Sequence, residues 1–188
     1  MSDPVASGYV GRSVLRREDR RLLTGRGIFV GDLELPGMLH AAIVRSPLAH
    51  ARIISVDMSA AAAIPGVVLT VTGAELLRAL PPVPEQQVAL PNRWRRAVKH
   101  SFKSPRQPIL AFKRVRHVGE AVAVIVARDR YTAEDAVACV RVELEPLAVV
   151  ADLDAALARG APLLHPELGT NVISEYEIGK GDVETAFR

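Results

Sequence analysis

The chain has 188 residues, of which 49% are hydrophobic and only 4% aromatic, and a formal net charge of +3. This length allows one domain with extended arms, and such a domain can bury enough surface to fold without metal or disulfides. The single cysteine, Cys139, excludes an internal disulfide, and no apolar run reaches the roughly 18 residues that a membrane helix needs. The first residues lack the basic and apolar pattern of a secretory signal, so the expected location is cytoplasmic.

Residues 1–27 are predicted to form an N-terminal arm, because they show little apolar periodicity. Within the arm, Arg20 to Leu23 are predicted to form one helical turn that Gly25 closes. The folded domain is predicted to span residues 28–150. Its first half is expected to contain two strands, a short alanine-rich helix, a buried strand and a second helix, at 38–45, 51–57, 58–63, 67–71 and 72–80.

The second half of the domain is organised around the stretch from Val115 to Ala127. Its continuous apolar run indicates a central strand that is covered on both faces. A helix is expected to start near Asp129, with Thr132 and Asp135 at capping-box spacing. Residues 141–146 alternate polar and apolar, which predicts a half-exposed strand. Short helices among several strands indicate an α+β domain.

Residues 151–188 are predicted to be a C-terminal extension. It is expected to hold a short helix capped by Asp152, a strand at 176–178 and a last helical start after Gly181.

Residues 81–108 carry six prolines and no periodicity, which predicts a long loop. Nine of the chain's 24 basic residues lie between Gln86 and Gly119, where there is no acidic residue. Two interpretations stay open, namely docking to an acidic partner and a solvated loop. One tryptophan is a poor stacking platform, which argues against nucleic acid. The candidate partner-binding residues are Arg93, Trp94, Arg95, Arg96, Lys99, Lys103 and Arg106.

No other feature has the pattern of a catalytic or metal site. Cys139 lies beside an apolar helix face, which predicts an inert, packed thiol. The five histidines show no metal-ligand spacing, and Glu143 and Glu145 fit a solvated strand face. The glycine-rich pieces at 24–27 and 179–182 complete no phosphate-binding motif. The chain is therefore expected to contain no catalytic, cofactor-binding or metal-binding residue.

An ordered set of short stretches resembles a known family. They lie at 11–14, 17–19, 23–27, 32, 35–41, 44–53, 65–68, 118–120, 124–127, 134–136, 165–171 and 181–183. Together they are similar to the start of the molybdenum-binding subunit of the xanthine dehydrogenase and aldehyde oxidase family, closest to carbon monoxide dehydrogenase large-subunit-like members. Two residues depart from the family pattern, Ala121 in place of proline and His117 in place of tyrosine.

The resemblance implies an α/β hammerhead fold, with a mixed sheet and short helices. In the family, the molybdopterin-binding region follows this domain and carries the catalytic glutamate, and none of its motifs occurs here. The implied role is a structural N-terminal domain or split subunit, inactive alone, which packs on the remainder of the large subunit. Iron–sulfur and FAD cofactors are implied on partner subunits. The alternative is a stand-alone binding module that uses the basic 93–116 stretch to bind an acidic protein or nucleic acid.

Overall fold

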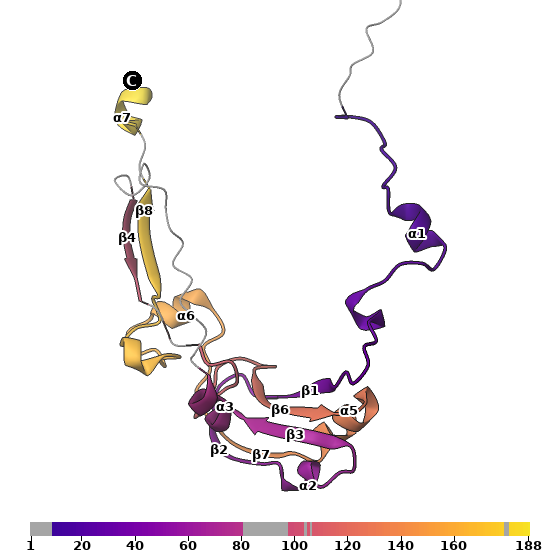
Figure 1. The fold of residues 1–188 in the computed structure, drawn as a ribbon. Coiled ribbons are helices and arrows are strands. Elements are labelled where there is room, and N and C mark those ends of the chain that lie inside the picture. Colours follow the sequence, from indigo (N-terminus) through magenta and orange to yellow (C-terminus); the bar gives the residue numbers. More distant parts are fainter. Residues whose placement is uncertain (1–8, 81–97, 104, 106, 179–180) are drawn as a thin grey trace, which may run out of the picture. The chain divides into compact units, whose positions relative to one another are not determined.

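The computed structural model describes residues 9–80, 98–103, 105, 107–178 and 181–188. The chain divides into two compact units, Met1–Met38 and Leu39–Arg188. In the first unit, an extended trace is interrupted by helix α1 (Asp19–Leu23) and the 3-10 turn η1 (Val30–Asp32) (Figure 1). Gly25 follows α1 with φ +68°, so the predicted closure of this turn by glycine is confirmed.

The second unit contains two three-stranded sheets and a two-stranded ribbon. The strands are β1 (His40–Arg45), β2 (Ala51–Asp57), β3 (Val67–Thr72), β4 (Val98–Phe102), β5 (Arg114–Val115), β6 (Ala121–Ala127), β7 (Arg141–Pro146) and β8 (Ser174–Ile178). The helical elements are α2 (Ser59–Ala62), α3 (Gly73–Ala79), α5 (Arg130–Ala138), α6 (Leu153–Leu157), η2 (Pro166–Leu168) and α7 (Val183–Ala186). The predicted α+β class is confirmed.

The strand directions differ from the expected mixed sheet. The sheets have the orders β1-β6-β3, β5-β2-β7 and β4-β8, and their described pairings are all antiparallel. Strands β6 and β7 follow one another through α5, yet they lie in different sheets. Helix α5 therefore links two sheets, and it does not form the crossover that would place two parallel strands in one sheet.

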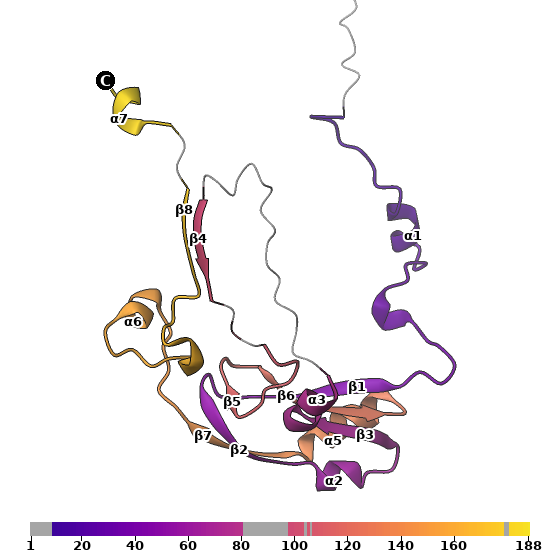
Figure 2. The same cartoon turned by 60° about the vertical axis from the view of Figure 1, so that its left-hand side comes forward.

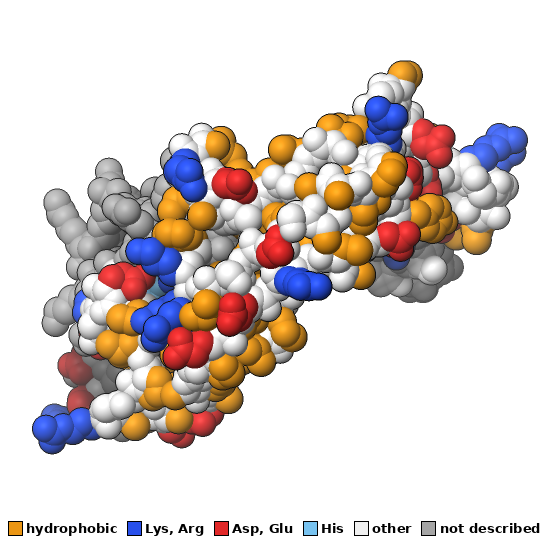
Figure 3. All heavy atoms as spheres, turned by 90° about the horizontal axis from the view of Figure 1, so that it is seen from below, with side chains coloured by type: hydrophobic (Ala, Val, Ile, Leu, Met, Phe, Trp, Pro, Cys, Tyr) orange, Lys and Arg blue, Asp and Glu red, His pale blue; other side chains and the backbone are white. Residues whose placement is uncertain are grey.

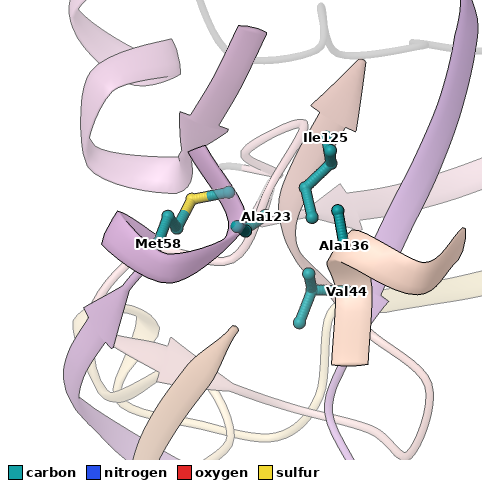
Figure 4. Packing of buried hydrophobic residues seen from close by; sticks show 6 residues of the cluster. Val44, Met58, Ala123, Ile125 and Ala136 are labelled. Carbon is teal, nitrogen blue, oxygen red and sulfur yellow. The ribbon is translucent and has the colours of Figure 1, made fainter. Parts of the chain in front are cut away.

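Strand β6 is the centre of the first sheet and is covered on both faces, as predicted. Ala123 and Ile125 belong to one buried cluster, whereas Val122 belongs to the other. Successive side chains of a strand point to opposite faces, so this strand supports both clusters. Figure 4 shows the first cluster, in which Val44 of β1 and Ala136 of α5 lie near Ile125 (Figure 4). The small side chains of Ala123 and Ala136 let α5 lie close to the sheet, which fits a core with few aromatic side chains.

The start of α5 corrects a detail of the sequence-based prediction. The cap residue is Asp129, whose carboxylate accepts hydrogen bonds from the Thr132 amide (2.8 Å) and the Thr132 hydroxyl (2.7 Å). The predicted pair of Thr132 and Asp135 is therefore wrong by three residues, almost one turn. At the other end, Cys139 is the C-cap residue and is exposed. The prediction of a packed thiol is wrong, because the buried face of α5 consists of Ala133 and Ala136, and Cys139 lies just beyond the end of the helix.

The ribbon of β4 and β8 joins two distant parts of the sequence (Figure 2). Val98 pairs with Ile178, and Phe102 pairs with Ser174. The predicted C-terminal strand is thus confirmed, but residues 98–102 form a strand where a loop was expected. Among the described residues, no helix is long and apolar enough to cross a membrane.

Candidate docking surfaces

Most of the predicted partner-binding residues lie outside the described part of the chain. They are Arg93, Trp94, Arg95, Arg96 and Arg106. Lys99 lies in β4, and Lys103 follows this strand with an exposed side chain. The Lys103 amide donates a hydrogen bond to the Ile173 carbonyl (2.8 Å), which extends the ribbon by one contact. Partner binding through these seven residues stays a prediction.

The described end of the basic stretch is not uniformly available to a partner. The Arg116 guanidinium lies 4.0 Å from the Glu120 carboxylate, and the side chains are only 16% and 15% exposed. The same carboxylate accepts a hydrogen bond from the Arg116 amide. By contrast, Lys113 is exposed, and its ammonium lies 5.3 Å from the centre of the Phe112 ring. Arg116 therefore serves the local structure, because its charge is partly balanced within the fold.

Two of the family-like stretches meet at the turn before β6. Gly119 has φ +83°, and its amide donates to the Ser46 carbonyl (2.8 Å), while the Ser46 amide donates to the Glu120 carbonyl (2.9 Å). The Arg45 guanidinium also donates to the Gly119 carbonyl (2.9 Å). This pairing could not be predicted from the sequence, because only the tertiary fold brings the two segments together.

A cleft of about 300 Å³ lies among residues 148–173 and the start of β2. His50 lines it and is itself buried, with Nδ1 2.7 Å from the Ala148 carbonyl oxygen. Because a carbonyl oxygen can only accept, Nδ1 carries the proton in this contact. The buried Nε2 has no hydrogen-bond partner among the described residues. His50 thus fastens the segment after β7 to the start of β2.

Asn171 closes the loop on the other side of the cleft. Its Nδ2 donates to the carbonyls of Ala156 (3.1 Å) and Pro162 (3.0 Å). Its Oδ1 accepts from the Leu164 amide (3.1 Å). In the sequence, Asn171 stands out only as part of a family-like stretch. An asparagine inside a loop can satisfy several backbone groups at once, and this is the signal that would have found it.

The carboxylates with lowered pKa values serve the local structure. The pKa of the Glu167 carboxyl is lowered by a hydrogen bond from its own backbone amide, with a further contribution from His165 at 3.1 Å. The carboxylates of Asp57, Glu75, Asp129 and Asp182 also have lowered pKa values, because hydrogen bonds from Ser59, Thr72, Thr132 and Thr185 stabilise them. Each of these four carboxylates accepts from an amide at the start of a helix.

The described residues do not fit a molybdenum centre. They include no group of three or more His, Cys, Asp or Glu side chains that is arranged to hold a metal ion. The carboxylates of Asp57, Glu75, Asp129 and Asp182 each accept hydrogen bonds at a separate helix start. On the face in Figure 3, apolar side chains lie between single charges of both signs (Figure 3).

The fold and these surfaces agree with a defined protein family. Residues 24–148 match the family described as "Aldehyde oxidase and xanthine dehydrogenase, a/b hammerhead domain". The chain belongs to this family, which confirms the resemblance found in the sequence. The matched limits differ slightly from the 28–150 expected for the folded domain, and the predicted division into arm, domain and extension stays a prediction.

Individual relatives match almost the whole chain. The nicotine 6-hydroxylase large subunit of Paenarthrobacter nicotinovorans is 39% identical over 186 residues, which cover 99% of this chain and 21% of that protein. Quinoline 2-oxidoreductase from Pseudomonas putida 86 superposes with a TM-score of 0.72 at 44% identity, over 87% of this chain and 19% of that one. A Cu,Mo-CO dehydrogenase superposes with a TM-score of 0.65 at 37% identity, over 84% and 18%. The chain spans about a fifth of the length of these relatives.

Proposed function

We propose that this chain is the hammerhead portion of the large subunit of a molybdenum-dependent hydroxylase or dehydrogenase. In this role it packs on the molybdopterin-binding remainder of the subunit and does not turn over substrate alone. One observation carries the proposal: the nicotine 6-hydroxylase large subunit matches 99% of this chain with only 21% of its own length. The described residues supply two buried clusters and no grouping fit for a metal, which supports a structural role.

The proposal places the cofactors outside this chain. The molybdopterin centre would be held by the remainder of the large subunit, and iron–sulfur and flavin cofactors would be held by partner subunits. One of the solved relatives is a Cu,Mo-CO dehydrogenase, which supports molybdenum as the metal. The surfaces that would meet the remainder include the segment around the cleft, because it follows the matched hammerhead region and leads toward β8.

The test is a pull-down from an extract of the source organism with the tagged 188-residue chain. Retained polypeptides are identified by peptide sequencing, and their metal content is measured. The expected result is a molybdenum-containing polypeptide similar to the other four fifths of the relatives. An unrelated protein or nucleic acid, with no molybdenum, would contradict the proposal. The matched control is the same chain carrying Ile125→Ala, which removes a fully buried side chain from the core.

A further inference from the structure

We draw no further inference here: the strongest candidate, the cleft after β7 that His50, Leu153 and Ile173 line, carries nothing, because nothing in the structure shows what covers it and the Nε2 of His50, which has no partner among the described residues, is itself buried.

Discussion

Gly73 lies so close to Ala111 that a β-carbon on Gly73 would come within 2.1 Å of the Ala111 carbonyl oxygen. The added β-carbon would meet backbone atoms of Ala111, so no flexible side chain can move away to relieve the contact. The start of α3 therefore depends on glycine for this approach, and not for an unusual backbone angle.

Gly73→Ala should destabilise the chain by about 1–3 kcal/mol or more, because the added methyl group forces a backbone shift. Urea unfolding followed by circular dichroism measures the change. Gly31→Ala is the control, since a β-carbon there meets nothing within 4 Å. Equal stability of the two variants would contradict the close approach.

Ile125→Ala should destabilise the chain by about 2–5 kcal/mol, because this fully buried side chain fills the space between β6 and α5. Ile54→Ala is the matched control, since Ile54 is half exposed in β2. The free energy of unfolding of each variant decides the question. If both variants lose the same stability, Ile125 is not the centre of the core.

Asn171→Ala should lose about 1–3 kcal/mol, because it leaves backbone groups of the cleft loop without partners. Asn171→Asp keeps the acceptor for the Leu164 amide but removes both donors. Hydrogen exchange at Leu164 should therefore rise in the alanine variant and stay slow in the aspartate variant. Rapid exchange in the parent chain would show that the loop is not closed by Asn171.

The cap of α5 should make stability depend on pH. The hydrogen bond from the Thr132 hydroxyl, together with backbone amides, holds the pKa of Asp129 below its usual value of 3.8. A lowered folded pKa gives stability that is present above the unfolded pKa and is lost as the pH falls through the folded pKa. Asp129→Ala should therefore lower the thermal midpoint at pH 7, and the difference from the parent should shrink as the pH falls below 3.8. A constant difference down to about pH 2 would assign the effect to something other than the carboxylate.

The basic stretch offers a test of the alternative function. If the chain acts as a stand-alone module, alanine at Arg93, Arg95 and Arg96 should abolish partner retention, and the affinity of the parent should fall steeply with salt. In the hammerhead account, the triple variant still retains the molybdenum polypeptide. The pull-down decides between the two.

The sequence predicted the parts of the fold that depend on local pattern. The apolar run of β6, the alternation of β7 and the glycine after α1 each correspond to an observed element. Strand directions were not predictable in this way, because an isolated pattern does not identify a partner. The pairing of β4 with β8 joins residues about 75 positions apart, and prolines near β4 favoured a loop.

The docking surfaces were less predictable than the fold. The basic stretch could be identified as a candidate surface because its charge can be counted in the sequence. The ion pair between Arg116 and Glu120, however, could not be predicted from that charge. The roles of His50 and Asn171 depend on carbonyl groups that only the tertiary structure brings within reach. The N-terminal arm was predicted as residues 1–27 from its lack of pattern, and this division of the chain stays a prediction.

The central claim is that this chain supports a molybdenum enzyme without holding its cofactor. The most direct measurement is the molybdenum and pterin content of the purified chain, compared with that of the assembly it captures. The account predicts background levels in the chain alone and a stoichiometric cofactor in the assembly, bound to the other polypeptide. Tight molybdopterin binding by the isolated 188-residue chain would contradict it.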